Sequence, residues 1–240
     1  MLDNQVIISS VLLTIEFLGT FAFAISGIRK AIWHQYDWFG CLVCGIAVAI
    51  GGGTIRDLLL GVTPFWMTSP LYLIAAVLAQ LFVFLSARIL RRLNWAWLLF
   101  DTLGLGLFTI AGVQKTLACG HPYWVAVIMG CITGSAGGVL SDVLLNREPT
   151  LFRKEIYATA CIIGGCIYCL MEQSACPVTV NCVITFLCIC LIRLIAIRYH
   201  LSMPRLVPRH LKHAVRKSVR VRSPSGRPSA DQGATTTQKS

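Results

Sequence analysis

Seven stretches of mostly apolar residues, each about 20 residues long, follow one another along this chain of 240 residues. A helix needs about 20 such residues to cross the hydrocarbon layer of a membrane. Only 13% of the residues are charged, too few for an ordinary soluble domain. The sequence therefore predicts an all-α transmembrane protein with seven helices. The expected spans are residues 6–28, 39–61, 69–90, 95–114, 123–145, 155–173 and 178–199.

Basic residues gather at alternate ends of these spans, which predicts the orientation of the chain. They are Arg29, Lys30, Arg88, Arg91, Arg92, Arg147, Arg153 and Lys154, and only Lys115 lies at an opposite end. Cytoplasmic loops carry an excess of Lys and Arg. The N-terminus is therefore expected outside and the C-terminus in the cytoplasm. The first stretch has no Lys or Arg before it, which indicates a lasting span and not a cleaved signal peptide.

Residues 200–240 form a separate basic segment. They contain nine Lys or Arg residues against Asp231 alone, and their polar end cannot build a core. A disordered cytoplasmic tail is expected here. Its natural partners are the anionic headgroups of membrane lipids. Nucleic-acid binding is disfavoured, because no aromatic residues alternate with the basic ones.

The chain contains an internal repeat, in which residues 16–75 align with residues 101–160 without a gap. Fifteen of the sixty aligned positions are identical. The identical pairs include Gly19/Gly104, Gly27/Gly112, Lys30/Lys115, Gly45/Gly130, Gly52/Gly137, Gly53/Gly138, Asp57/Asp142, Pro64/Pro149 and Tyr72/Tyr157. Because each unit holds three spans, the second unit must enter the membrane from the opposite face. Inverted repeats are typical of transport proteins, although a duplication without a transport role is the alternative.

The repeat divides the chain into four expected parts. Residues 1–93 and 94–174 are the two three-helix units. Residues 175–199 are the seventh helix, and residues 200–240 are the tail. This division places the glycine-rich segments and the acidic residues of the two units at matching positions.

Glycines interrupt the second and fifth spans at those positions. Gly51, Gly52 and Gly53 follow one another in the second span, and Gly137 and Gly138 lie in the fifth. Each glycine costs a helix about 1 kcal/mol relative to alanine. A kink or an unwound turn is therefore expected in both spans, with its freed backbone groups facing a cavity. Close packing of helices through small residues is the alternative.

Glu16, Asp57, Asp101 and Asp142 lie within the spans. Arg56 is the one basic residue taken as clearly inside the membrane, so the interior is expected to be negative and to favour a cation. Neighbours on a helix point in different directions. Arg56 is thus expected to pair with an acid of the other half or with a lipid phosphate, and not with Asp57. The alternative is that both are interfacial charges at a helix end.

Eleven cysteines lie almost entirely within the apolar stretches, where Cys behaves as a small hydrophobe. The pairs Cys41/Cys44 and Cys166/Cys169 are therefore interpreted as packing residues. No metal or other cofactor is expected. The sequence contains no phosphate-binding loop and no nucleophile elbow, so an enzyme is not expected.

Three segments carry a family resemblance: residues 51–57 (GGGTIRD), 64–66 (PFW) and 152–158 (FRKEIYA). Over residues 7–199 the chain resembles a bacterial membrane-protein family with a doubled glycine transporter domain. That family is similar to the trimeric intracellular cation (TRIC) channels. The resemblance implies a homotrimer in the bacterial inner membrane, with a pore for monovalent cations such as potassium in each subunit.

The resemblance also assigns residues to that pore by position. One half of its constriction would be formed by Gly51, Gly52, Gly53, Arg56 and Asp57, and the other half by Gly137, Gly138 and Asp142. Apart from these residues, Glu16, Asp101 and Ser141 are expected to line the same path. At Ser141 the chain departs from the family, whose second motif usually has Arg, and the two halves are expected to be electrically unequal.

Three functions are compatible with these features. The leading hypothesis is a passive cation pathway. The second is a carrier for glycine or another small zwitterion. The third is a non-transporting membrane scaffold that presents the basic tail to a partner.

Overall fold

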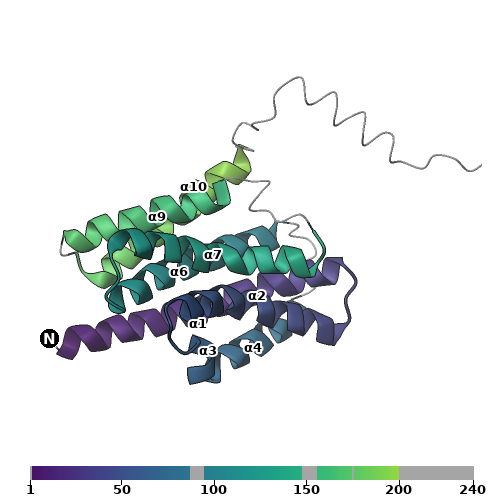
Figure 1. Ribbon diagram of the computed structural model, residues 1–240. Coiled ribbons are helices and arrows are strands. Elements are labelled where there is room, and N and C mark those ends of the chain that lie inside the picture. Colours follow the sequence, from purple (N-terminus) through teal and green to yellow (C-terminus); the bar gives the residue numbers. More distant parts are fainter. Residues whose placement is uncertain (1, 87–94, 148–155, 175, 200–240) are drawn as a thin grey trace, which may run out of the picture. The chain divides into compact units, whose positions relative to one another are not determined.

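The computed structural model describes residues 2–86, 95–147, 156–174 and 176–199 (Figure 1). Every regular element in these ranges is a helix, which confirms the predicted all-α class for this part of the chain. The helices are α1 (Leu2–Trp33), α2 (Trp38–Leu59), α3 (Phe65–Thr68), α4 (Leu71–Leu85), α6 (Ala96–Ala118), α7 (Tyr123–Leu144), α9 (Ile156–Gln173) and α10 (Val178–Arg198).

Six of these helices are long and apolar enough to cross a membrane: α1, α2, α6, α7, α9 and α10. They match six of the seven expected spans. The third expected span corresponds to α4, which is apolar but covers 15 residues. Residues 87–94 after it, residues 148–155 and the tail 200–240 lie outside the described ranges. The seventh span and the four-part division therefore stay predictions.

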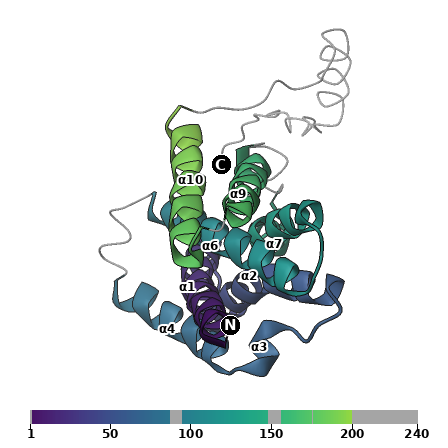
Figure 2. The same ribbon diagram turned by 90° about the vertical axis from the view of Figure 1, so that its left-hand side faces the viewer.

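Four helices lie in the middle of the bundle. Figures 1 and 2 show α1, α2, α6 and α7 between α4 on one side and α9 and α10 on the other. Helix α1 packs against α2, α4 and α6, whereas α6 packs against α7, α9 and α10. Helices α2 and α7 pack against each other. The central four helices therefore join the two repeated units.

The turns after these four helices share one geometry. Backbone φ is positive at Gln35 (59°), Gly61 (68°), Gly120 (80°) and Asn146 (51°). A left-handed residue after a helix ends it and reverses the chain. In the alignment of the two units, Gln35 matches Gly120 and Gly61 matches Asn146. The same chain reversals therefore recur at equivalent positions of the sequence repeat.

Packing within each pair of central helices also recurs between the units. A Cβ atom on Gly27 of α1 would lie 2.9 Å from Cγ2 of Val48 in α2. A Cβ atom on Gly112 of α6 would lie 2.7 Å from Oγ1 of Thr133 in α7. Thr133 is the repeat partner of Val48, and Gly112 is that of Gly27. Only glycine allows helices to approach this closely, which explains why both positions kept it.

Helices α2 and α7 cross in contact through their backbones. A Cβ atom on Gly52 would collide with the carbonyl oxygen of Thr133, and one on Gly137 would lie 2.6 Å from the carbonyl oxygen of Val48. Val48 precedes Gly52, and Thr133 precedes Gly137, so the two helices run antiparallel at the crossing. The crossing therefore uses the same two positions of each unit.

The predicted unwound turns at the glycines are wrong. Both helices keep α-helical backbone through them, from Trp38 to Leu59 and from Tyr123 to Leu144. Here the missing side chains allow close approach of another helix, and the backbone hydrogen bonds along each helix remain. The alternative of close packing through small residues is what the structure has.

We expect Gly137→Ala to destabilise the protein by about 1–3 kcal/mol, because the added methyl group would meet the backbone of α2. Thermal unfolding of the detergent-solubilised protein measures this loss. Gly165→Ala in α9 is the matched control, since a Cβ atom there meets nothing closer than 3.4 Å. Equal melting temperatures for both variants would contradict the close crossing.

Candidate functional site

The first charge cluster surrounds Arg56, whose side chain is fully buried. Its Nη2 donates to Oε1 of Glu16 at 2.8 Å, and its Nε donates to Oδ1 of Asp57 at 2.8 Å. The Tyr72 hydroxyl donates to Oε2 of Glu16 at 3.1 Å. Lys115 of α6 completes the cluster, with Nζ 2.9 Å from Oδ1 of Asp57. Helices α1, α2, α4 and α6 each contribute to this network.

These contacts correct the predicted partners of Arg56. The first partner is the neighbouring Asp57, whose Oδ1 accepts a hydrogen bond from Nε of Arg56. The second is Glu16, which belongs to the same half of the repeat, and not to the other half or to a lipid. Both Arg56 and Asp57 are fully buried within the protein, in the last turn of α2. A guanidinium without access to water requires carboxylates within reach.

The end of α2 explains why Asp57 has a fixed position. Its second oxygen, Oδ2, accepts a hydrogen bond from the backbone N–H of Phe65 at 2.7 Å. The indole N–H of Trp66 donates to Oγ1 of Thr54 at 3.0 Å. Hydrogen bonds thus connect the motif at residues 51–57 to residues 64–66, where α3 begins. Both segments carry the family resemblance.

The other predicted glycines lie against neighbouring side chains. A Cβ atom on Gly51 would lie 2.5 Å from Cδ2 of Leu140 in α7. The ring of Phe65 covers Gly53, where a Cβ atom would collide with it. A Cβ atom on Gly138 would lie 2.6 Å from the hydroxyl oxygen of Tyr157. These glycines therefore make room for the residues around the charge clusters.

The second charge cluster gathers Asp101, Asp142, Lys30, Tyr157 and Arg193. Nζ of Lys30 lies 3.4 Å from Oδ1 of Asp142 and 4.0 Å from Oδ1 of Asp101. Nη2 of Arg193 lies 3.8 Å from Oδ2 of Asp101. Cζ of Arg193 lies 4.4 Å from the centre of the Tyr157 ring, within the range of a cation–π contact. Helices α1, α6, α7, α9 and α10 contribute to it.

The two halves exchange lysines. Lys115 of the second unit pairs with Asp57 of the first, and Lys30 of the first unit pairs with Asp142 of the second. The two lysines are repeat partners of each other, and so are the two aspartates. Sequence reasoning had assigned both lysines to helix ends near water and had missed these pairs.

The prediction of an acidic interior is wrong. Four buried carboxylates face four bases: Glu16 and Asp57 face Arg56 and Lys115, whereas Asp101 and Asp142 face Lys30 and Arg193. Between the two repeated units the expected inequality remains, because Ser141 stands opposite Arg56, and the fourth base, Arg193, lies outside both units. Buried ions require partners of opposite charge, so acids inside a membrane predict bases beside them.

Sequence reasoning missed Arg193 altogether. This arginine lies within the last apolar stretch, and only 2% of it is exposed. A lone arginine among apolar residues is the sequence signal that could have revealed it. Ser141, the departure from the family pattern, is also buried, one position before Asp142 in α7.

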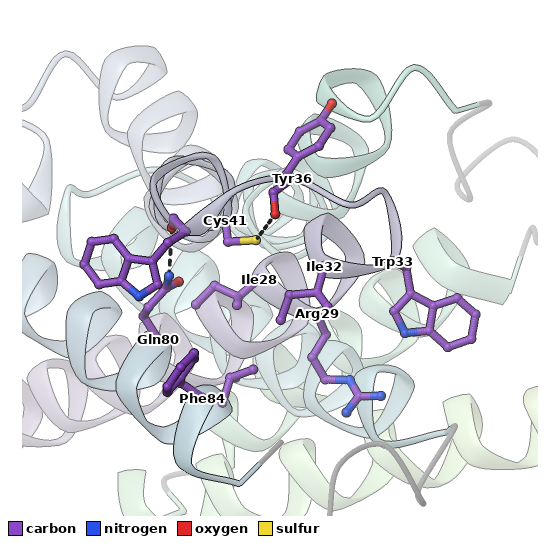
Figure 3. Close-up of a pocket in the computed structure, with 10 residues that line it drawn as sticks. Ile28, Arg29, Ile32, Trp33, Tyr36, Cys41, Gln80 and Phe84 are labelled. Carbon is purple, nitrogen blue, oxygen red and sulfur yellow. Dashed lines mark hydrogen bonds between the residues drawn. The ribbon is translucent and has the colours of Figure 1, made fainter. Parts of the chain in front are cut away.

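A pocket of about 380 Å³ lies apart from both clusters. It is formed by α1, α2, the turn between them and α4 (Figure 3). Its apolar wall contains the amide of Gln80, whose Nε2 donates to the carbonyl oxygen of Trp38 at 2.9 Å, and the thiol of Cys41 (Figure 3). No residue of either charge cluster lines it.

The cysteines are all free thiols. Cys41, Cys44 and Cys169 are buried, and Cys166 is exposed. In the part of the chain that the structure describes, no three His, Cys, Asp or Glu side chains gather as metal ligands.

Comparison with known sequences places the chain in a family. The family model described as glycine transporter matches residues 13–88 and again residues 98–173, which correspond to the two repeated units. A UPF0126 membrane protein of Vibrio cholerae is 42% identical over 82% of this chain and 83% of its own length. The UPF0126 inner membrane protein YadS of Escherichia coli K12 is 40% identical over 79% of this chain and 93% of its own length.

A solved structure has the same fold. The TRIC trimeric intracellular cation channel orthologue from Rhodobacter sphaeroides superposes with a TM-score of 0.75 at 31% identity, over 80% of this chain and all of that one. Two matches to one family model, membrane-protein relatives and six apolar helices agree. The chain therefore belongs to the glycine transporter family, as a multi-pass membrane protein with the fold of the TRIC channels.

Proposed function

We propose that this protein forms a passive pathway for monovalent cations such as potassium, between α2 and α7 of each subunit of a homotrimer. The observation that carries the proposal is the exchange of lysines between the two halves, in which Lys115 holds Asp57 and Lys30 holds Asp142. The matched solved structure is described as a trimeric cation channel, which supports both the cation and the trimer.

The two aspartates lie on opposite sides of the helix crossing. Asp57 follows Gly52 by five residues, and Asp142 follows Gly137 by five residues. Five residues of α-helix extend about 7.5 Å. Because α2 and α7 cross antiparallel at the glycines, the carboxylates face opposite ends of the bundle. A cation that passes the crossing would meet one carboxylate before it and one after it.

A lysine ammonium occupies the position that a permeating cation would take at each carboxylate. Removal of one partner from a buried ion pair costs about 3–5 kcal/mol. A membrane voltage supplies about 2.3 kcal/mol per elementary charge and per 100 mV when that charge crosses the whole field. Voltage therefore biases these pairs without breaking them by itself, and a competing cation would complete the exchange.

If the pathway runs between α2 and α7, the arrangement of these helices would be its closed form. Backbone lies against backbone where Gly52 meets Thr133 and where Gly137 meets Val48. Passage of an ion requires the two helices to separate or turn at the crossing. Such a movement would also have to shift the side chains that lie against these glycines, such as Leu140 at Gly51 and Phe23 at Gly137.

The proposed setting is the inner membrane of a bacterium, with the N-terminus outside and the C-terminus in the cytoplasm. The distribution of Lys and Arg favours this orientation. The two units would then be inverted repeats and α4 would belong to the third of seven spans. The basic segment at residues 200–240 would contact anionic lipid headgroups.

Transport of glycine or another small zwitterion is the second candidate. Each cluster contains acids and bases side by side, such as Asp57 and Lys115 at 2.9 Å. The carboxylate and the amine of an amino acid could exchange with this pair. A zwitterion carries both charges, so clusters with equal numbers of acids and bases suit it better than an acidic interior would.

We expect the purified protein in liposomes to pass potassium well above empty vesicles, and Asp57→Asn to lower this flux by about tenfold, as about 1.4 kcal/mol on a barrier would. Asp37→Asn is the matched control. Asp37 is the exposed N-cap of the same helix, and Asn caps equally well. Potassium flux no higher than in empty vesicles contradicts the cation pathway. Saturable glycine uptake that Asp57→Asn abolishes would support the carrier instead.

We expect Lys115→Met to raise the potassium flux several-fold, because Asp57 would then lose the ammonium that blocks it but keep Arg56. Lys115 is partly exposed, so the protein should tolerate the change. Lys115→Arg, which keeps the charge, should retain the wild-type flux. A flux in Lys115→Met that equals or falls below the wild-type value rules out the lysine as the blocking cation.

A further inference from the structure

The second charge cluster has no arginine at the position that matches Arg56 in the sequence repeat. The partners of Glu16, Asp57 and Tyr72 are Asp101, Asp142 and Tyr157, and the lysines are exchanged symmetrically. The partner of Arg56, however, is Ser141. By the repeat alone, Asp101 and Asp142 would share a single base, Lys30.

Arg193 fills this gap from outside the repeat. It lies on α10, which follows both units, and 2% of it is exposed. Its Nη2 is 3.8 Å from Asp101, the counterpart of Glu16. Its guanidinium covers the ring of Tyr157 at 4.4 Å. Arg56 has the corresponding neighbours in the first cluster, since it binds Glu16, to which Tyr72 also donates.

The substitution leaves the second cluster looser than the first. Arg56 makes two hydrogen bonds of 2.8 Å, whereas Arg193 approaches its carboxylate only to 3.8 Å. Each guanidinium leaves one buried nitrogen without a hydrogen-bond partner among the described residues, Nη1 of Arg56 and Nε of Arg193, so the clusters differ in the distances to the carboxylates. A guanidinium that approaches from α10 therefore matches this carboxylate less well than one placed on α7 beside Asp142.

We propose that Arg193 has the same role in the second charge cluster as Arg56 has in the first. Helix α10 therefore supplies a base to a cluster whose acids belong to the second repeated unit. Arg193 is then a positioning residue, which holds Asp101 beside Lys30 and keeps the cluster neutral. That this neutrality sets the charge along the ion path rests on the proposed function. The pairing itself does not depend on which solute crosses.

The proposal predicts that the arginine can be moved back to α7. Four variants of the full chain test this: Arg193→Met, Ser141→Arg, the double variant S141R/R193M, and Arg198→Met as the control. Methionine keeps a long side chain over Tyr157 but removes the charge. Arg198 is an exposed arginine on the same helix.

We expect Arg193→Met to lower the melting temperature of the detergent-solubilised protein by about 10 °C, because it leaves a buried carboxylate without its guanidinium. Ser141→Arg alone should also lower it, since two guanidiniums would then compete for Asp101. The double variant should recover at least half of the loss seen in Arg193→Met, and Arg198→Met should match the wild type. Recovery of less than half, or no loss in Arg193→Met, overturns the proposal.

Variants that fail to fold still give an answer. If Arg193→Met yields no monodisperse protein, a monodisperse S141R/R193M variant supports the proposal, and its failure overturns it.

In liposomes, Arg193→Met should raise the permeability ratio of potassium to chloride, and the double variant should restore it. An unchanged ratio overturns the role in the ion path. If the wild type conducts nothing, the proposed function fails while the melting temperatures still decide the pairing.

Discussion

A charged side chain inside the hydrocarbon layer is stable only beside its opposite. This constraint organises the centre of the protein. In two separate clusters, four carboxylates face four bases, and the bases lie on four different helices, α1, α2, α6 and α10. The ion pairs thereby fix the positions of the helices relative to one another. Apolar contacts between helices are less specific, because lipid tails are as apolar as the side chains.

A second constraint is geometrical. Helices α2 and α7 touch through glycines at matching positions, and Phe23 stacks on its own repeat partner, Phe108, with ring centres 5.3 Å apart. Contact between equivalent residues is what a two-fold relation between the units would produce. Such a relation would also account for the exchange of lysines. If Lys115 of the second unit reaches Asp57 of the first, a two-fold relation brings Lys30 of the first unit to Asp142 of the second.

The sequence predicted those properties that depend on one segment at a time. Apolar length located six helices that are long enough to cross a membrane, and the internal repeat identified Glu16, Asp57, Asp101 and Asp142 at matching positions of the two units. It failed for properties that depend on which helices touch. The glycines of α2 pack against α7 and do not unwind, because a neighbouring backbone takes the space. Arg193 entered the second cluster from a helix that the repeat does not contain, so no comparison of the two units could reveal it.

The exchange of lysines also bears on how the protein is made. When the first three apolar segments leave the ribosome, Asp57 has Arg56 beside it, but Lys115 has not yet been synthesised. At that stage the charge network of the first unit is incomplete. The second network closes last, because Arg193 arrives only with the final segment. Assembly of this interior is thus a late event, which cannot finish before nearly the whole membrane portion has been inserted.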